Sequence, residues 1–593
     1  MTALRTIGDW LQERTAWRSW GRRLLDHPLV GGGPWGSALA ASVATCFGVL
    51  ALTGVLLMTA YAPAPQSAWA SVHYVQFMQP GGWLVRGLHY WAAQAMFVLA
   101  AVHILQGGLA GAYRKPGEIG WWLTLLVLGV AVAEGITGGL LPWDQLGWWA
   151  RVVEGNIAGL APVVGGFVQQ MIAGGPELGA LGLTRAFTAH VLLLPPILAL
   201  ALWGRRALAR SAGPASLDDP AVRMRVARNV CVAVLVLFGI FALAGAAHGA
   251  PLDAPADPLG DYPARPEWFL LPMFQLRKFF HGAMEFWGTS LVPAAAAAYL
   301  ALLPWIDRPG RRRALAVCIP VVTIFVGAVV LSLVARRHDA RDAHYRKARA
   351  YADARATAAI QLAKNGVPPA GALAMVQTDP ELRGRDLFDK HCASCHVLGE
   401  MGDPEKATAT KLDGWGTPAW IQAMIHDPDA PEFFGRGPYK EQMPSVDTRP
   451  KNKPANEPWS AMVKTPEEKS AVALFLASLG DEPGDPPRPI DPATLALGEK
   501  IVSERCTTCH LYKGDGDDQG SGLAPELAGY GSIAWTHAQV ANPATATTYR
   551  DKALDPEMKK HMPRFDGDLS AADVDVVARW TRSHARASVY AAH

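Results

Sequence analysis

Charged residues are scarce in this sequence. Lysine, arginine, aspartate and glutamate make up only 18% of its 593 residues, whereas hydrophobic residues make up 50%. This balance excludes an ordinary soluble enzyme, and the length exceeds that of one typical domain. From Met375 to the C-terminus, 33 acidic residues stand against 24 basic ones, although the whole chain carries a net charge of +3. The sequence therefore predicts an apolar, basic membrane part followed by an acidic polar part.

Cysteine is scarce as well, and most of it falls in two short motifs. Four of the seven cysteines lie in "CASCH" and "CTTCH", namely Cys392, Cys395, Cys506 and Cys509. The other three stand alone within apolar runs, where we expect small buried side chains: Cys46, Cys231 and Cys318.

The start of the chain lacks the pattern of a removable signal peptide. Seven later stretches are long and apolar enough to cross about 30 Å of hydrocarbon as helices: 37–61, 83–108, 119–141, 184–205, 229–248, 286–305 and 314–335. Basic residues gather before the first stretch and after the second, fourth and sixth, on the side that the positive-inside rule makes cytoplasmic. We expect a cytoplasmic segment over 1–30, a seven-helix membrane domain over 31–337 in a bacterial inner membrane, and a periplasmic remainder.

The polar part contains an internal repeat. Residues 338–376 have the composition of a solvated helical linker. Beyond it, "GRDLFDKHCASCH" and "GEKIVSERCTTCH" share a helix-like lead-in to C-x-x-C-H, and corresponding cysteines lie 114 residues apart. Each copy ends in a segment with amphipathic helical spacing. We therefore predict two small all-α domains, over 377–484 and 489–593, so that the whole chain is mainly α.

Each C-x-x-C-H motif predicts a covalently attached haem c. The two thiols form thioether bonds to the haem, and the adjacent histidine, His396 or His510, becomes an axial ligand of the iron. A zinc knuckle or a redox dithiol is the alternative, and two copies that each precede a Met-Pro pair disfavour it. The expected second axial ligands are Met443 in "QMPS" and Met562 in "HMPR". Their rivals are Met401, Met424, Met462, Met558 and His561.

Histidines in the second apolar stretch are spaced for stacked cofactors. His89 and His103 lie fourteen residues apart, which on an α-helix is about 40° short of four turns and a rise of roughly 21 Å. Both imidazoles therefore face one side of the helix at different membrane depths. Together with His190 in the fourth stretch, this spacing favours haem ligation over isolated packing residues.

Five segments resemble cytochrome b of quinol-oxidising bc complexes and occur in the same order: "YRKPGEIGWW", "TGGLLPWDQLGWWA", "APVVGGFVQQMIAGGPELG", "LTRAFTAHVLLLP" and "ARPEWFLLPMFQLRK". With the apolar stretches, the resemblance covers residues 20–335. It implies that His89 and His190 ligate an outer haem b, with Arg86 beside a propionate. It also implies that Glu267 accepts a proton from quinol at an outer oxidation site. The two tail domains are similar to small class I cytochromes c.

The resemblance fails at the inner haem. It implies a ring held by His103 and by a histidine fourteen or fifteen residues after His190, but Gly204 and Arg205 stand there. A guanidinium offers no acceptor lone pair to a metal. We therefore expect an inner haem that is absent or abnormally held.

Two further departures lie beside the same ring. The family implies glycines where helices pass each haem, and they are kept at Gly54 and Gly138 for the outer ring. At the inner ring Ala40 and Thr124 replace them, and even a small Cβ crowds a porphyrin face. The alternatives are rescue by another ligand or a five-coordinate haem on His103, and the candidate ligands are His27 and Met224. Glu134, inside the third stretch, is expected to be either a proton relay or a hydrogen-bonded structural group.

Together these features predict the cytochrome b subunit of a quinol:cytochrome c oxidoreductase, fused to a dihaem cytochrome c. The expected cofactors are one or two haems b and two covalent haems c, with quinol as substrate. The sequence contains no Cys-x-His and Cys-x-x-His pair of a Rieske protein, so that partner would be a separate subunit. We expect a soluble cytochrome c or terminal oxidase as acceptor, a homodimeric complex in lipid, and no nucleic acid. The alternatives are a membrane-anchored conduit that couples another dehydrogenase to periplasmic carriers, and an assembly scaffold without b haems.

Overall fold

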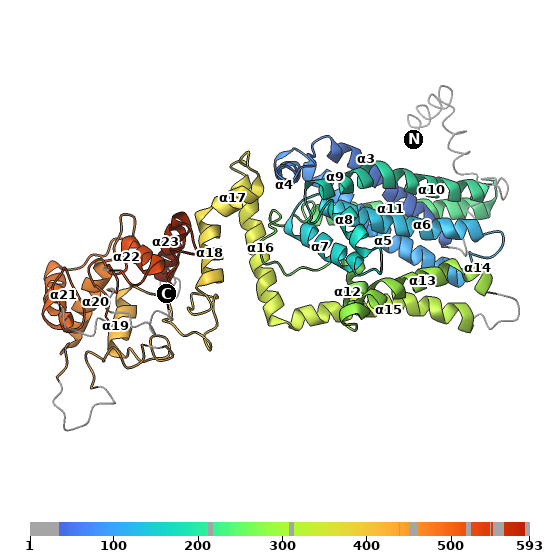
Figure 1. Cartoon of the computed structure of the whole chain (residues 1–593). Helices are drawn as coiled ribbons and strands as arrows, with labels where there is room; N and C mark the ends of the chain where they lie inside the picture. Colours follow the sequence, from blue (N-terminus) through green and yellow to red (C-terminus); the bar gives the residue numbers. More distant parts are fainter. Residues whose placement is uncertain are drawn as a thin grey trace. The chain divides into compact units, whose positions relative to one another are not determined.

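The structure is a computed structural model that describes residues 35–210, 218–307, 314–437, 439–449, 460–516, 524–545, 547–549 and 562–587. The chain divides into two compact units, Met1–Val376 and Gln377–His593 (Figure 1). Both units are helical. Within the described ranges, β-type pairing is limited to isolated bridges such as that of Asp144 with Pro255. The predicted mainly α fold is confirmed.

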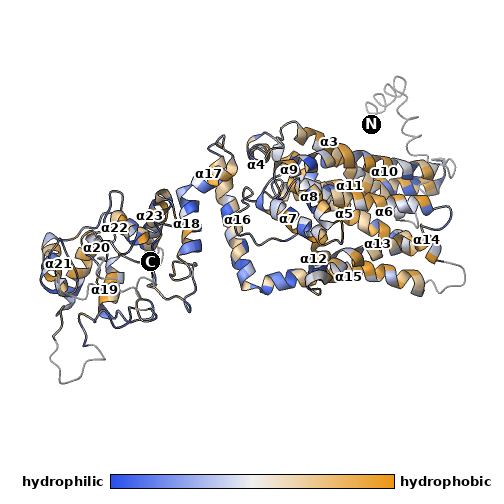
Figure 2. Cartoon of the chain, viewed as in Figure 1, coloured by the Kyte–Doolittle hydropathy of each residue, from blue (hydrophilic) through white to orange (hydrophobic). Residues whose placement is uncertain are grey.

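Six helices of the first unit are long and apolar enough to cross a membrane, and Figure 2 colours them largely orange. Each overlaps one predicted stretch. They are α3 (Gly36–Met58), α5 (Gly82–Ala110), α6 (Glu118–Leu140), the run α9–η2–α10 (Ala180–Thr188, Ala189–Leu193, Leu194–Arg210), α11 (Pro220–Ala246) and α15 (Ile319–Arg341), which η6 (Ala314–Cys318) precedes.

The predicted sixth stretch, 286–305, is not one long helix. It is divided into η5 (Trp287–Leu291), α13 (Val292–Ala301) and α14 (Leu303–Ile306). η5 runs without a break into α13, and the non-helical Leu302 separates α13 from α14, in whose first turn Pro304 lies. The count of seven membrane helices is therefore not confirmed by the six long helices found among the described residues.

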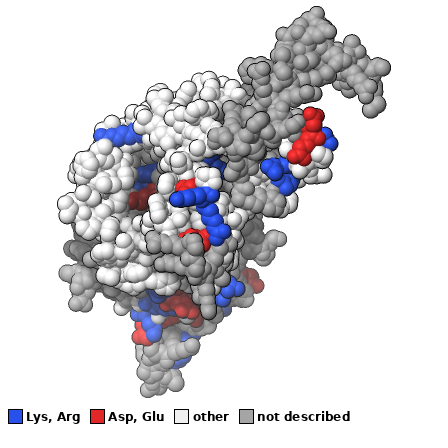
Figure 3. All heavy atoms as spheres, turned by 90° about the vertical axis from the view of Figure 1, so that its right-hand side faces the viewer, with Lys and Arg blue, Asp and Glu red and all other residues white. Residues whose placement is uncertain are grey.

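α5 lies at the centre of the long helices, packed against α3, α6 and α11. Its inward face carries small side chains such as the buried Ala92 and Ala100, and small residues let helix backbones approach closely in a membrane. Large apolar side chains point outward instead, and Leu52 and Phe238 are 67% and 72% exposed. Outward apolar side chains of this kind suit contact with lipid. Figure 3 looks onto the ends of the long helices, where the lysine, arginine, aspartate and glutamate side chains drawn in colour form small groups.

Shorter helices connect the long ones in the first unit. These are α4 (Ala68–His73), η1 (Tyr74–Met78), α7 (Gln145–Gly159), α8 (Gly165–Ala173), η3 (Trp268–Leu270), α12 (Leu271–Arg277) and η4 (Gly282–Met284). The predicted linker contributes α16 (Ala343–Ala363), and α17 (Ala372–Thr378) follows it. α16 is not solvated on all sides, because Arg349 donates to the Tyr262 hydroxyl at 2.6 Å and Ala359 and Ala363 are buried.

The second unit consists of α18 (Pro380–His391), α19 (Pro418–His426), α20 (Pro466–Ser478), α21 (Pro492–Arg505), η7 (Cys506–Thr508), α22 (Ile533–Ala541) and α23 (Ala571–Ala587). Local sequence explains where these helices begin. Asp379, Thr417 and Asp491 each accept a hydrogen bond from a backbone N–H of the first turn, and a proline follows each of them. Such caps satisfy N–H groups that lack partners within the helix.

The two sequence repeats do not fold as two separate units. α18 packs along α23 and α20 packs along α21, so the leading helix of each repeat contacts the closing helix of the other. This differs from the expected order of one domain over 377–484 and a second over 489–593. The physical reason is that the apolar faces of the two closing helices are buried in cores built from both repeats.

Some predicted features lie outside the described residues, namely the segment 1–30, His27, Met558 and His561. The three isolated cysteines are free, but only Cys46 is fully buried, while Cys318 is half-buried and Cys231 is exposed.

Candidate functional site

The structure brings the imidazole rings of His89 and His190 close together. His89 lies on α5, and His190 lies on the π-helical turn η2, a distortion that is frequent at functional sites. Their ring centroids are 6.2 Å apart and their planes are inclined by 69°. Two imidazoles bound to one metal ion through bonds of about 2.0–2.1 Å hold their ring centres roughly 6 Å apart. The pair therefore fits a bis-histidine haem.

Hydrogen bonds orient both imidazoles. The Thr53 hydroxyl donates to the Val49 carbonyl at 2.6 Å, so its oxygen is left to accept from His89 Nδ1 at 2.9 Å. His190 Nδ1 lies 2.7 Å from a carboxylate oxygen of Glu134. A proton on Nδ1 leaves Nε2 as the metal-binding nitrogen, which is how protein surroundings fix the tautomer of a ligand histidine.

The two glycines expected beside the outer ring line this pair. A Cβ on Gly54 would lie 3.2 Å from His89 Cε1, and a Cβ on Gly138 would lie 2.6 Å from His190 Cε1. The Gly138 position therefore has no room for a side chain unless His190 moves. Arg86, one turn before His89, donates to the Ala250 and Pro251 carbonyls at 2.7 and 2.5 Å.

His103 lies at the other end of α5 in a different environment. Its side chain is 5% exposed, and neither ring nitrogen has a hydrogen-bond partner within the described part of the chain. Arg205 on α10 is close enough for its charge to act on this imidazole. Thr124 is buried and donates to the Gly120 carbonyl at 2.8 Å. The structure thus brings no second histidine to His103 among the residues it describes.

Glu267 lies beside a small cavity formed by α6 and α7. Arg151 and Glu154 from α7 line the cavity with Gly139 from α6. Arg151 pairs with Glu154 at 2.9 Å and also donates to the Ile136 carbonyl. Burial, together with the nearby carboxylates of Asp144 and Glu154, raises the pKa of Glu267 to about 7. A carboxyl group with that pKa can take up and release a proton near neutral pH.

The two C-x-x-C-H turns are built alike in the second unit. His396 N donates to the Cys392 carbonyl and His510 N to the Cys506 carbonyl, both at 2.9 Å. His396 Nδ1 bonds to the Thr410 carbonyl at 2.8 Å, and His510 Nδ1 bonds to the Pro525 carbonyl at 2.9 Å. Burial lowers the pKa of both imidazoles, so Nε2 keeps its lone pair for a metal.

A largely apolar cavity lies between these turns. It is lined by both proximal histidines, three of the motif cysteines and both predicted axial methionines, that is His396, His510, Cys392, Cys506, Cys509, Met443 and Met562. Met424 and Met462 also line it. Apolar walls, free thiols and imidazoles held at Nδ1 fit covalently attached haem.

Sequence reasoning missed Arg151, Glu154 and Thr53. Arg151 and Glu154 are three residues apart on α7, as in many surface ion pairs, and only their position in the same cavity as Glu267 points to a function. A buried charged pair at helical spacing within the tryptophan-rich segment after Asp144 was the available signal. Thr53 directly precedes Gly54, the glycine expected beside the outer ring, and this neighbour was the available signal.

Comparison with known proteins finds relatives of both units. The family model for cytochrome b/b6/petB matches residues 35–208, and the cytochrome c model matches residues 382–480 and 495–585. A cytochrome bc complex cytochrome b subunit of Chlorobaculum thiosulfatiphilum is 31% identical over 300 residues, covering 48% of this chain and 68% of that protein. A menaquinol:cytochrome c reductase cytochrome b subunit of Bacillus subtilis (strain 168) is 36% identical over 204 residues, covering 33% and 91%.

A solved structure described as a hyperthermophilic respiratory Complex III aligns with a TM-score of 0.47 and 25% identity, covering 55% of this chain and 91% of that one. The sequence relationships decide the family. This chain belongs to the cytochrome b subunits of bc-type quinol:cytochrome c reductases, and it carries two cytochrome c sequences after the membrane unit.

Proposed function

We propose that this chain oxidises quinol at the cavity beside Glu267 and delivers the electrons outward, through a separate Rieske iron–sulfur subunit, to its own cytochrome c part. The observation that carries the proposal is the raised pKa of Glu267 at a cavity lined by Gly139 of α6, the helix whose Gly138 lies against His190. A membrane-anchored conduit without its own quinol site would not need a carboxyl group of this kind.

Glu267 accepts a quinol proton in this proposal. Its pKa of about 7 lets the carboxylate form exist at neutral pH and still bind a proton. Arg151 holds Glu154 by an ion pair at 2.9 Å, which keeps a second carboxylate within the same cavity. Gly139 lies against the Glu267 carboxylate, where a Cβ would come within 3.4 Å of Oε1.

The cofactors follow from the side chains that would hold them. His89 and His190 hold one haem b, with Arg86 at the propionate side, and the two C-x-x-C-H motifs hold one haem c each with Met443 and Met562 as further axial ligands. When bound, these haems supply the one-electron carriers that a bc-type reductase uses. His103 lacks a second axial ligand, because Arg205 cannot ligate iron. The inner haem is therefore absent or altered.

The proposed surroundings follow from the same features. The chain lies in a bacterial inner membrane with its N-terminus in the cytoplasm and its cytochrome c part in the periplasm, in a homodimeric complex. Acidic residues outnumber basic ones beyond Met375, which suits a basic soluble cytochrome c or the docking face of a terminal oxidase as acceptor.

Replacement of Glu267 by glutamine tests the proposal. We expect quinol:cytochrome c turnover of the purified complex to fall roughly 10²–10⁴-fold, the usual contribution of a positioned proton acceptor. Because the carboxylate is the active form, wild-type turnover should rise with pH through about 7, and the variant should lose this rise. Glu118→Gln, a carboxyl in the first turn of α6, is the matched control. Unaltered turnover of Glu267→Gln would favour the conduit.

A further inference from the structure

In the second unit, the leading helix of each repeat packs on the closing helix of the other repeat through a glycine. A Cβ on Gly384 of α18 would lie 2.4 Å from Trp580 Cβ of α23. A Cβ on Gly498 of α21 would lie 2.3 Å from the Ala471 carbonyl oxygen of α20. Gly384 and Gly498 hold the same place in the two repeats, 114 residues apart. Each leading helix therefore uses its glycine to approach the closing helix of the other repeat.

The cores around the two motifs follow the same exchange. Cys392 contacts a core that joins Phe388 and Leu398 of the first repeat to Trp535, Val540 and Phe565 of the second. Cys506 contacts a core that joins Ile501 and Leu527 of the second repeat to Ile421, Ile425 and Val446 of the first. Each C-x-x-C-H turn is thus packed against a core to which the other repeat also contributes.

The chain passes from one core to the other at two glycine pairs. Gly414 and Gly416 have φ of 76° and 75°, and Gly529 and Gly531 have φ of 69° and 75°. These left-handed conformations favour glycine. The aromatic residues between them, Trp415 and Tyr530, pack with ring centroids 5.8 Å apart. Both crossings therefore lie together between the two cores.

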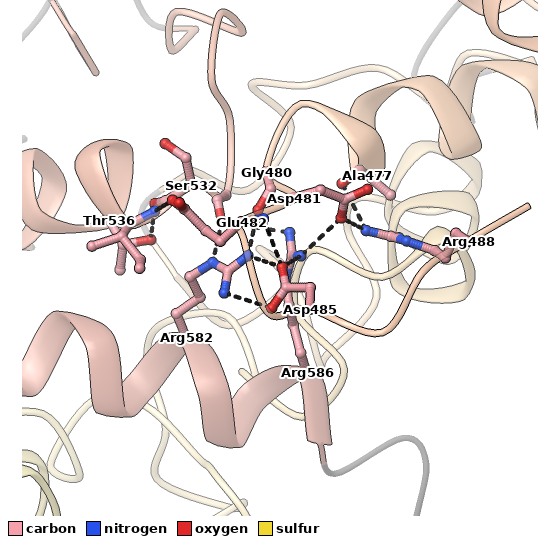
Figure 4. Close-up of polar contacts among 12 residues, drawn as sticks. Ala477, Gly480, Asp481, Glu482, Asp485, Arg488, Ser532, Thr536, Arg582 and Arg586 are labelled. Atoms are coloured by element: carbon pink, nitrogen blue, oxygen red, sulfur yellow. Dashed lines mark hydrogen bonds and ion pairs between the residues drawn. The ribbon is translucent and has the colours of Figure 1, made fainter. Parts of the chain in front are cut away.

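Ion pairs hold the last helix to the segment between the repeats (Figure 4). Arg582 of α23 is 4% exposed, donates to the Gly480 and Gly531 carbonyls, and contacts the Asp485 carboxylate twice, once at 3.2 Å. Arg586 pairs with Asp485 at 3.2 Å from the next turn. This cluster fixes the closing helix of the second repeat away from its own leading helix.

Backbone bonds attach each predicted axial methionine to the core of the opposite motif. Val446 N, three residues after Met443, donates to the Ile425 carbonyl at 3.1 Å, within the core that contains Cys506. Phe565 N, three residues after Met562, donates to the Ala541 carbonyl at 2.9 Å, at the edge of the core that contains Cys392. Met443 itself packs against the Cys506 core.

We propose that the axial methionines are exchanged between the repeats. The haem attached at Cys392 and Cys395 takes Met562, and the haem attached at Cys506 and Cys509 takes Met443. This assignment rests on the haem c sites of the proposed function and adds which methionine serves which iron. It makes the two haem sites one folding unit, since neither repeat contains both axial ligands of its own haem.

The test removes one haem from the full-length chain by replacing Cys392 and Cys395 with alanine. Histidine–methionine ligation gives a ferric haem c a weak long-wavelength absorption band and a high reduction potential. In this background we expect Met443→Ala to abolish the band of the remaining haem c and to lower its midpoint potential. Met562→Ala should change neither. Loss of the band with Met562→Ala and not with Met443→Ala would overturn the proposal.

The reverse double variant serves the same test if the protein lacking Cys392 and Cys395 does not accumulate in the membrane. With Cys506 and Cys509 replaced by alanine, Met562→Ala should abolish the band and Met443→Ala should not. Retention of the band in all four variants would overturn both the exchange and the choice of these methionines. Haem b content and quinol turnover of the wild-type complex report on the proposed function separately.

A second measurement does not depend on ligation. A protease site inserted between Pro489 and Ile490 allows the chain to be cut between the repeats in washed membranes. The exchange predicts that the C-terminal fragment stays with the membrane after cleavage, because its helices complete both cores. Release of that fragment into the soluble fraction would overturn the exchange.

Discussion

Glu134 and His190 form the most directly testable pair of residues in the membrane unit. A carboxylate 2.7 Å from His190 Nδ1 increases the electron donation of an axial imidazole and stabilises the oxidised, more positive iron. The same contact suits the structural role of Glu134, one of the two roles that the sequence left open, and the variant below distinguishes it from a proton relay. It also explains how a carboxyl group is tolerated inside a membrane helix.

Replacement of Glu134 by glutamine should therefore raise the midpoint potential of haem b. A hydrogen bond to a charged group contributes roughly 1.5–3 kcal/mol. Only the part of this free energy that differs between oxidised and reduced haem shifts the potential, so the increase should stay below about 130 mV. Redox titration of the b band measures the shift, with Glu118→Gln on the same helix as control. An unchanged potential combined with lost turnover would instead assign Glu134 to proton transfer.

At the scale of single elements, α6 offers a matched pair of glycines. A Cβ on Gly138 would lie 2.6 Å from His190 Cε1, whereas one on Gly129 would have nothing within 4 Å. Gly138→Ala should therefore displace His190 and reduce haem b content severalfold, while Gly129→Ala should leave it unchanged. The b band per unit of protein measures both variants. Equal haem b content in the two would show that Gly138 is not beside the ring.

The elements also show where sequence reasoning is sufficient. The long apolar helices and the shared face of His89 and His103 could be predicted, because hydrophobic length and the fourteen-residue spacing are local properties. The pairing of His89 with His190 is not local and came only from the resemblance to cytochrome b. The π-helical turn at His190 and the division of 286–305 into short helices could not be predicted, since both depend on packing against neighbours. Arg151 and Glu154 gain their meaning only when the 267 region folds beside α7.

At the scale of the whole second unit, the similarity of the two repeats does not show which helices pack together. Both leading helices carry a glycine that fits a closing helix, and both closing helices carry an apolar face. Packing within a repeat and packing between repeats therefore satisfy the local sequence equally well. The repeats could therefore be found from sequence, but not which halves pack together. Arg582 and Asp485, which are 97 residues apart, help to decide the pairing in the fold.

Replacement of Arg582 by alanine should destabilise the second unit by about 2–4 kcal/mol, since it removes a nearly buried guanidinium that donates to the Gly480 and Gly531 carbonyls and pairs with Asp485, leaving Arg586 as the remaining arginine partner of the latter two. Arg579, on the same helix and 56% exposed at its side chain, pairs with Asp575, and its alanine variant should cost no more than about 0.5 kcal/mol. Thermal unfolding followed by the haem c signal compares them. Equal losses would contradict a structural role for the Arg582 cluster.

The ratio of haem b to haem c in the purified chain is the most direct test of a single haem b on His89 and His190. Pyridine haemochrome spectra distinguish the two haem types, and we expect one haem b for two haems c. His89→Ala should remove the b signal and leave the c signal. A ratio of one to one would contradict the absence of an inner haem at His103, and a preparation without any haem b would contradict the site itself.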